Sequence, residues 1–385
     1  MAPMTQADRP PMHVLHTFAN NTTVPYLTWF TDRAVAEGAP RYSFIIMHRE
    51  RPKMMDEMRA KGFEVVWIPY DDGKRKRGML RALPLLWWHI LRLKPDIVHV
   101  NLFDDSLPGL MAAWFAGVRR RVITRQDTGF HWMHAPRWVA LDRWNNRMAT
   151  RIIAISEENR RFMIDKEQAP PEKVVLVHNG IPPDRFTRQH PEVMQDLRTR
   201  FGIGPDHLVI GNVARHVEWK GHRHVIQAAA LLVATHPNAR FLLCGAGAGR
   251  EAMERLALDL GLHDHVTFID RIEPEHMPSF YGILDLYIHG ATLEPFGLVY
   301  AEAMLNGIPV VSTRTGAALD AITDGESGIL VPEANGAALA QGVLRLLALD
   351  RKAVGRAGRD AARNLFVFDR MWQGTMAVYN DLMRK

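Results

Sequence analysis

The chain has 385 residues, of which 47% are hydrophobic and 23% are charged. This length suits two domains rather than one core, and the composition excludes disordered and fibrous proteins. The single cysteine, Cys244, excludes a disulfide framework and a multi-cysteine zinc site, and it fits a reducing compartment. Because the N-terminal segment lacks a signal-like apolar stretch and no apolar run reaches membrane-spanning length, we expect a cytoplasmic protein.

The net charge of +6 is distributed unevenly along the chain. Residues 1–185 carry 28 basic and 20 acidic side chains, whereas the remaining residues carry 20 and 22. A basic first half predicts an anionic partner for that half. The sequence contains no zinc-finger spacing, RNP-type aromatic motif or basic heptad, so we expect no nucleic acid among the partners.

Short β-rich segments alternate with helical ones along the chain, and the alternation restarts after residue 200. The first series has expected strands at 13–17, 43–47, 64–69, 97–101, 121–124, 151–155 and 174–178, with helices at 26–37, 54–61, 107–115 and 157–165. The second has strands at 208–213, 240–244, 265–269, 286–289, 309–312 and 328–331, with helices at 225–234, 250–260, 277–282, 298–306 and 337–348. This pattern predicts two Rossmann-like α/β domains.

The densest basic cluster, Lys74 to Arg77, leads into an apolar and aromatic segment that contains Trp87 and Trp88. This pattern predicts an amphipathic helix. Residues Lys74–Trp88 are therefore a candidate contact with an anionic membrane surface, at the inner face of the membrane. The alternative is a core helix with a solvated basic start.

The joint between the two series is expected at Asn179-Gly180-Ile181-Pro182-Pro183. Glycine permits unusual backbone angles there, and the prolines exclude a helix interior or a central strand. We therefore expect a first domain over 1–182, a second over 183–365 and a terminal helix over 366–385.

An arginine and a lysine follow the first strand of the second series. Arg215 can hold phosphate oxygens in a fork, and Lys220 supplies a point charge five residues later. Two cations directed at one diphosphate stabilise it as a leaving group, so this chemistry needs neither a metal nor a cofactor. The alternative is that both side chains are simply solvated in a loop.

Two carboxylates, Glu294 and Glu302, flank the expected start of a helix, and Phe296 and Gly297 immediately precede that start. The free N–H groups and the dipole of a helix N-terminus favour phosphate, and Gly297 lets a ligand approach the backbone. At ~1.5 Å per residue, Glu302 lies about 7 Å inside the helix. A diphosphate and the ribose of the same nucleotide are separated by a similar distance. The alternative is that Glu302 only begins a surface helix.

These segments, in this order, resemble the retaining GT-B glycosyltransferases of family 4, also called the group 1 family. The resemblance is dense from about 174 to 348. The motifs that carry it are Val177-His-Asn-Gly-Ile181, the Arg215/Lys220 pair, Leu243-Cys-Gly-Ala-Gly247, Tyr281 with Asp285-Leu-Tyr, the Glu294/Glu302 pair, Gly307-Ile-Pro-Val-Val311 and Asp324 to Pro332.

The resemblance implies a GT-B fold, in which two Rossmann-like domains face each other across a cleft. It implies a nucleotide-diphosphate-sugar donor in the second domain, an acceptor hydroxyl in the first, and transfer with retention of configuration in glycan or glycolipid assembly. It also implies a terminal helix that crosses back onto the first domain. The implied donor-binding residues are Arg215, Lys220, Gly245, Arg271, Phe296, Gly297, Leu298 and Glu302, with Glu294 toward the sugar.

The first half departs from the family in two places. Many members have a Gly-Gly loop after the first strand, where this chain has Asn20-Asn21-Thr22-Thr23. Many also have a histidine near the reacting centre, where this chain has Gln126, which cannot act as a base. The proton acceptor is then Asp127, His131 or the departing phosphate oxygen, and we favour the phosphate oxygen.

Four alternatives follow from other features of the sequence. The two departures also fit a nucleotide-sugar-binding protein without transfer activity, and the same scaffold fits a sugar-nucleotide epimerase. The run Gly245 to Arg250, with Asp270 about twenty residues on, approaches a dinucleotide fingerprint, but its third glycine is an arginine. His131-x-x-His134 has the spacing of a metal pair without an evident third ligand. The acceptor is expected to be polar, either lipid-linked or phosphorylated.

Overall fold

The computed structural model describes residues 11–19, 25–71, 73 and 75–384 and divides into two compact units. The first unit comprises residues 1–155, 159–177 and 372–385, and the second comprises 156–158 and 178–371. The units thus divide after Val177 and after Met371, a few residues from the expected boundaries at 182 and 365.

The first unit is built on a parallel sheet with strand order β3-β2-β1-β4-β5-β6-β7. Its strands are β1 (His13–Phe18), β2 (Arg41–His48), β3 (Glu64–Pro69), β4 (Ile97–Val100), β5 (Arg120–Arg125), β6 (Arg151–Ala154) and β7 (Val174–Leu176). The register pairs Val14 of β1 with Ile97 of β4, and Ile97 with Arg120 of β5. All seven strands therefore end at the same edge of the sheet.

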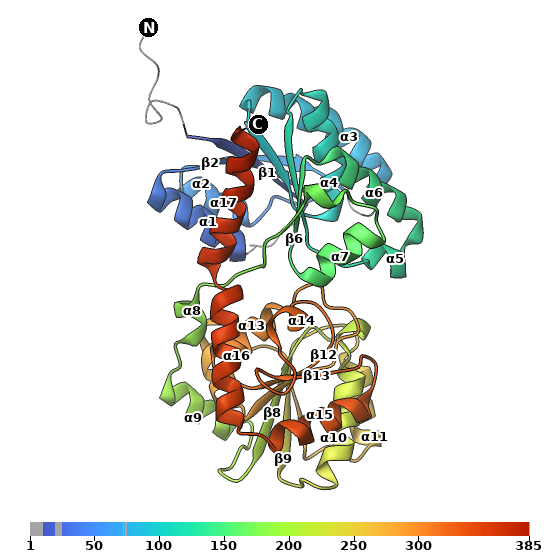
Figure 1. Cartoon of the computed structure of the whole chain (residues 1–385), viewed down its shortest axis with the longest axis vertical. Coiled ribbons are helices and arrows are strands. Elements are labelled where there is room, and N and C mark those ends of the chain that lie inside the picture. The colour runs from blue at the N-terminus through green and yellow to red at the C-terminus, as the bar shows by residue number, and fades with distance from the viewer. Residues whose placement is uncertain (1–10, 20–24, 72, 74, 385) are drawn as a thin grey trace. The chain divides into compact units, whose positions relative to one another are not determined.

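Helices cover both faces of this sheet, with α1, α2 and α17 on one side and α3, α4 and α6 on the other (Figure 1). Their bounds are α1 (Pro25–Glu37), α2 (Met54–Ala60), α3 (Arg75–Leu93), α4 (Phe103–Phe115), α5 (Phe130–His134), α6 (Val139–Met148), α7 (Glu157–Asp165) and α17 (Phe368–Arg384). Residues of α3 and α4 such as Leu86 and Leu110 bury their side chains against strand residues such as Leu15 and Val98. The terminal helix α17 is fixed by the hydroxyl of Tyr379 on the ring of His99.

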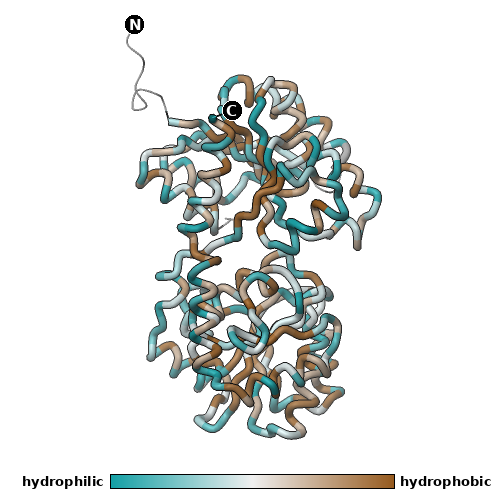
Figure 2. Tube along the Cα trace, in the orientation of Figure 1, coloured by the Kyte–Doolittle hydropathy of each residue, from teal (hydrophilic) through white to brown (hydrophobic). Residues whose placement is uncertain are grey.

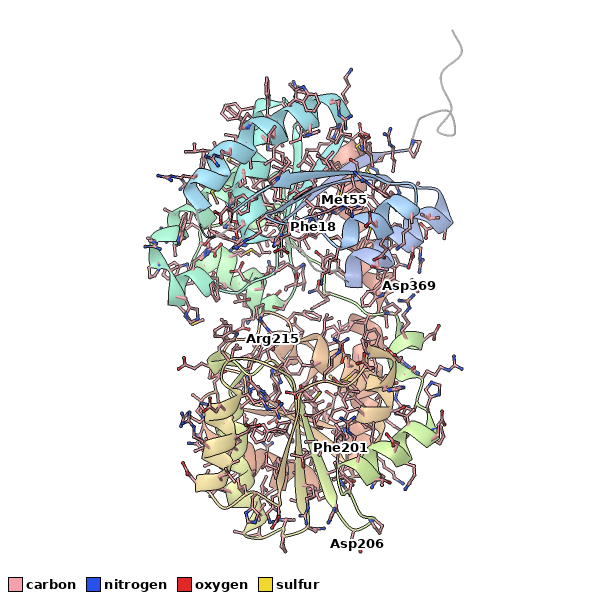
Figure 3. The ribbon with its side chains drawn as sticks, turned by 180° about the vertical axis from the view of Figure 1, so that it is seen from behind. Phe18, Met55, Phe201, Asp206, Arg215 and Asp369 are labelled. Atoms are coloured by element: carbon pink, nitrogen blue, oxygen red, sulfur yellow. The ribbon has the colours of Figure 1, made fainter. Side chains whose placement is uncertain are left out.

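The second unit is built on a six-stranded parallel sheet with order β10-β9-β8-β11-β12-β13. Its strands are β8 (Leu208–Val213), β9 (Ala239–Cys244), β10 (Val266–Ile269), β11 (Leu286–His289), β12 (Val310–Thr313) and β13 (Ile329–Val331). Figure 3 labels Asp206 and Arg215, which lie at opposite ends of β8. The loops that follow the strands, and with them Arg215, therefore share the carboxyl edge of the sheet, where ligands of parallel α/β sheets bind.

The helices of the second unit are α8 (Pro183–Thr187), α9 (Pro191–Arg200), α10 (His222–Val233), α11 (Arg250–Asp259), α12 (Met277–Gly282), α13 (Leu298–Leu305), α14 (Ala318–Ala321), α15 (Gly336–Leu347) and α16 (Arg351–Leu365). One core cluster joins α10, α11 and α15 to the strands, with residues such as Ile226, Phe241 and Leu339 fully buried. Figure 2 shows brown apolar segments running through the interior of each unit.

The two-domain α/β fold and the restart of the alternation are confirmed. All thirteen expected strands are present in the expected order, but helices α5, α6, α8, α9, α14 and α16 were not expected. Among the described residues, no helix has both the length and the apolarity needed to cross a bilayer. Lys74, the first residue of the predicted membrane-contact segment, lies outside the described residues, and α3 begins at Arg75.

Candidate functional site

The centre of the second unit's carboxyl edge is an ion pair between Lys220 and Glu294. Both side chains are largely buried, at 14% and 7% exposed. The Nε2 atom of His289, at the end of β11, lies 3.2 Å from the same carboxylate, and its Nδ1 lies 3.1 Å from the hydroxyl of Tyr287. Lys220, which is 74 residues away in sequence, and His289 thus meet at Glu294.

Glu294 is an ionised carboxylate in this setting. Burial alone would raise its pKa, but the hydrogen bond of His289 and the charge of Lys220 outweigh burial and lower that pKa to about 2. Burial lowers the pKa of His289, so its ring is neutral and donates Nε2–H to Glu294. Glu294 is therefore a hydrogen-bond acceptor and not a proton donor near neutral pH.

The backbone of the loop after β8 lies close to that of the loop after β11, and this contact brings Lys220 next to Glu294. The carbonyl of Trp219 accepts hydrogen bonds from the N–H of Thr292 at 2.9 Å and of Leu293 at 3.3 Å. The next glycine, Gly221, has φ of 69°, and a Cβ there would stand 1.7 Å from the carbonyl oxygen of Gly290. Only glycine fits this contact, which holds the loop after β8 against the loop after β11.

The N-terminus of α13 lies directly after Glu294. Gly297 is its N-cap residue, with φ of 84°, and a Cβ at this position would stand 3.0 Å from Cγ of Glu294. Phe296 is buried, and Leu298 is the first helical residue. The N–H groups of Leu298 and Val299 precede the hydrogen bond that Tyr300 donates to the carbonyl of Gly297 at 3.0 Å. Together with the helix dipole, such amides at a helix N-terminus favour an anion beside Glu294.

Glu302 lies one turn further along α13 and makes a contact separate from the Lys220–Glu294 pair. The hydroxyl of Tyr281 donates to its carboxylate at 2.8 Å. Burial raises the pKa of Glu302 to about 7, although the hydrogen bond from Tyr281 acts in the opposite direction. Among the described residues, neither a hydrogen bond nor an ion pair joins Glu302 to Lys220 or Glu294.

The remaining donor-binding candidates lie on neighbouring loops of the same edge. Arg215 is exposed. Gly245, after β9, is packed so closely that a Cβ would stand 2.0 Å from the carbonyl oxygen of Ala214, the residue before Arg215. Arg271, after β10, is exposed and pairs with Glu273 at 3.3 Å. The structure thus joins Lys220, Glu294 and Gly297 directly and places the others around them on separate loops.

The segment from Gly245 to Arg250 makes contacts that differ from those of a dinucleotide-binding fingerprint. Arg250, which stands where the third glycine would be, begins α11 and pairs with Asp270 and with Glu254. Asp270 is therefore engaged by an arginine of its own unit, rather than left for a ribose as the fingerprint requires.

In the first unit, the three catalytic candidates Gln126, Asp127 and His131 line one cavity of about 210 Å³ at the ends of β4 and β5. The Nδ1 atom of His131 lies 2.7 Å from the Oδ2 atom of Asp142, and both side chains are buried. The departure at Asn20–Thr23 lies outside the described residues. Within residues 11–19, 25–71, 73 and 75–384, no three His, Cys, Asp or Glu side chains are placed to hold a metal ion.

Beneath this cavity, Arg125 at the end of β5 binds three carboxylates. Its guanidinium donates to both oxygens of Glu167, at 2.7 and 2.9 Å, and lies 3.8 Å from both Asp127 and Asp142. Burial alone would lower the pKa of Arg125, but these charges raise it well above its ordinary value. Three residues of these two sites were not expected from the sequence: His289 was placed only in a strand, and Arg125 and Asp142 were given neither an element nor a role.

The two Rossmann-like α/β units have the GT-B fold. HepE of Anabaena, solved in complex with UDP, superposes with a TM-score of 0.81 and 20% identity and covers 96% of this chain and 100% of its own. Sucrose-phosphate synthase of Thermosynechococcus elongatus superposes with a TM-score of 0.79 and 18% identity, covering 97% and 99%.

The chain belongs to the group 1 glycosyltransferases, also called family 4. It matches the family model for glycosyl transferases group 1 over residues 193–361 and that for glycosyltransferase family 4 over residues 35–185. D-inositol 3-phosphate glycosyltransferase of Acidothermus cellulolyticus is 31% identical over 61% of this chain and 54% of its own length. A GDP-mannose-dependent phosphatidylinositol monomannoside mannosyltransferase of Mycolicibacterium smegmatis is 33% identical over 47% and 49%. The chain spans about half the length of these curated relatives.

The raised pKa of Glu302 gives a testable pH dependence. If its carboxylate accepts the ribose hydroxyls, affinity for a sugar nucleotide should rise about tenfold from pH 6 to pH 8, because ionisation passes through a pKa of about 7 in this range. The diphosphate of a sugar nucleotide is esterified at both ends and does not titrate there. Calorimetry measures the affinity.

Two variants serve as controls for this dependence. Glu302→Gln should bind more weakly and lose the slope. Tyr281→Phe removes the hydrogen bond that opposes the rise in pKa, so its midpoint should move to higher pH. An equal slope in Glu302→Gln would remove Glu302 from the ribose.

Proposed function

We propose that this protein transfers a sugar from a nucleotide-diphosphate sugar to an acceptor hydroxyl, with retention of anomeric configuration and without a metal or another cofactor. The observation that carries the proposal is the buried Lys220–Glu294 pair at the N-terminus of α13. A carboxylate and the first amides of α13 lie at one loop-to-helix junction, and Lys220 reaches this junction from the loop after β8. This arrangement suits a ligand with phosphoryl groups at one end and sugar hydroxyls at the other.

Each group has a role in this reaction. Arg215, Lys220 and the first amides of α13 stabilise the negative charge that develops on the departing diphosphate. Glu294, held ionised, accepts hydrogen bonds from hydroxyls of the donor sugar. Glu302 binds the ribose, and the loop that carries Arg271 and Ile272 meets the base. Gly245 lets the loop after β9 pack closely against the loop that carries Arg215, which leaves room for the nucleotide.

The transfer step breaks one bond and forms another at the anomeric carbon. The bond from this carbon to the diphosphate oxygen breaks with its electron pair on the oxygen. The acceptor hydroxyl attacks the same face, which retains the configuration, and its proton passes to the leaving phosphate oxygen. This step needs no side-chain base, so it is compatible with Gln126. The class of relatives supports glycan or glycolipid assembly as the setting.

The proposal is tested in two stages. A thermal-shift panel of UDP-, GDP- and ADP-sugars identifies the donor, because a bound ligand raises the melting temperature by mass action. Proton NMR of the product then reads the anomeric configuration. Retained configuration in the presence of a chelator supports the proposal. Donor binding without transfer to any acceptor would leave only a binding protein, and conversion of the donor without acceptor would indicate an epimerase.

We also propose that the first unit binds an anionic membrane surface at the cytoplasmic face. In the described part of the chain, the exposed large aromatic side chains all belong to this unit, among them Trp88 on α3, Trp114 on α4 and Trp132 on α5. Helix α3 packs against α4 and contains five basic residues and no acidic one. Exposed tryptophans beside cations are typical of interfacial segments.

Vesicle sedimentation tests this surface. The chain should sediment with vesicles that contain phosphatidylglycerol at low salt and should be released at high salt. Two variants should each reduce sedimentation severalfold. One has glutamine in place of the four basic residues at 74–77, and the other combines Trp88→Ser with Trp114→Ser. Leu258→Ser, which removes an apolar side chain 62% exposed on the second unit, is the matched control and should have no effect. Sedimentation unaffected by the first two variants would reject the surface.

A further inference from the structure

The cavity of the first unit has the size of a single small ring. It measures about 210 Å³ and lies at the carboxyl ends of β4 and β5, beside the starts of α4 and α5 and along α6. Pockets for drug-sized ligands measure roughly 300–1,000 Å³. The cavity therefore fits one monosaccharide-sized group rather than a chain of them.

Asn145, on α6, lines the cavity with an unused acceptor. Its side chain is 2% exposed, and its Oδ1 atom has no hydrogen-bond partner among the described residues. A buried amide oxygen without a donor is costly, and such atoms are rare in folded proteins. A ligand hydroxyl in the cavity would supply the missing donor.

His131 offers a second acceptor to the same cavity. Asp142 holds its Nδ1 atom at 2.7 Å, so the proton resides on Nδ1 and the lone pair on Nε2. No described residue forms a hydrogen bond with Nε2. The ring of Phe103 packs against the His131 ring with a centroid distance of 3.9 Å, which fixes its orientation.

The charges of the cavity lining disfavour an anionic ligand. The charged side chains among the lining residues are Arg125, Asp127 and Asp142. Arg125 already donates to both oxygens of Glu167 and faces both aspartates. A phosphate here would meet two carboxylates and no uncommitted arginine or lysine, whereas neutral hydroxyls match the two free acceptors.

We propose that this cavity binds an uncharged, hydroxylated ring of the acceptor, a sugar or a cyclitol. Asn145 and His131 accept hydrogen bonds from its hydroxyls, and Asp142 is the positioning residue that sets the tautomer of His131. The assignment to the acceptor rests on the proposed function. Of the two acceptor types expected from the sequence, the cavity favours one whose reacting ring carries no phosphate.

Saturation-transfer NMR on the full chain tests directly whether an uncharged ring binds. The probes are myo-inositol and methyl hexosides, each compared with its monophosphate. An uncharged probe should receive saturation and its monophosphate should not. Asn145→Leu should weaken binding of that probe about tenfold, the effect of one hydrogen bond. Arg147→Gln, an exposed change on the same helix, is the matched control and should leave binding unchanged.

Asp142→Asn tests the positioning role. An asparagine amide can donate to Nδ1, so the proton of His131 should move to Nε2, which long-range proton–nitrogen NMR detects as a change of tautomer. The affinity for the uncharged ring probe should fall as the tautomer changes, while the chain stays folded. Binding retained after the tautomer changes would overturn this role.

Three outcomes contradict the cavity assignment: saturation of no uncharged probe, preference for the phosphorylated probes, or equal binding by Asn145→Leu. Calorimetry with the sugar nucleotide separates this result from failure of the proposed function. The cavity variants should bind the donor as the unmodified chain does. If the donor does not bind the unmodified chain, the proposed function fails whatever the ring probes show.

Discussion

Arg125→Met is expected to lower the free energy of unfolding of the first unit by about 3–5 kcal/mol, the largest effect we expect from one substitution. Arg125 is 5% exposed and Glu167 is 1% exposed, and they share two hydrogen bonds. Methionine fills similar space without charge. The substitution therefore leaves Glu167, Asp142 and Asp127 close together with no cation between them.

Urea unfolding monitored by tryptophan fluorescence measures this loss. All tryptophans except Trp219 belong to the first unit, so the signal reports mainly on that unit. Arg147→Met, an exposed arginine on α6, is the matched control and should change stability by less than about 0.5 kcal/mol. A loss below about 1 kcal/mol in Arg125→Met would show that the carboxylates rearrange or take up protons at little cost.

Lys220→Met should reduce kcat for sugar transfer by roughly 10²–10³, because it removes a charge directed at the leaving diphosphate. It should also destabilise the second unit by about 3 kcal/mol. The pKa of Glu294, about 2 when folded, lies below its ordinary value of 4.5. The pair therefore stabilises the fold above pH 4.5, and this contribution is lost as the pH falls toward 2.

A double variant separates the two effects of Lys220. Lys220→Met with Glu294→Gln removes both charges, so much of the stability should return while transfer stays low. Arg223→Met, an exposed cation at the start of α10, is the matched control for both readouts. Transfer within about twofold of the unmodified chain in Lys220→Met would remove this lysine from the phosphate.

The strands were predictable because each is a short apolar segment between turn residues. The start of α13 was also predictable, since Phe296 and Gly297 precede a helical run and Gly297 adopts a φ of 84°. In contrast, α16 buries Gly355, Gly358 and Ala362 against the second unit. Together with Val354, these residues recur at helical spacing on one face of α16, so the sequence carried a helical signal here that the expected elements left out.

The contacts of the site were less predictable than its residue types. Lys220 and Glu294 were each assigned to a ligand, but their ion pair depends on β8 and β11 being neighbours in the sheet. Strand order is a property of the whole fold and leaves no local signal. Asp142 and Asn145 lie on α6, whose start follows Pro136 and a short aromatic helix, and no helix was expected there.

The most direct test of the central claim is a crystal structure of the protein soaked with the sugar nucleotide that the thermal-shift panel selects. The account predicts the diphosphate at the first amides of α13, within hydrogen-bond distance of Arg215 and Lys220, with the ribose on Glu302. A nucleotide bound elsewhere, or a diphosphate that Arg215 and Lys220 do not contact, would contradict it.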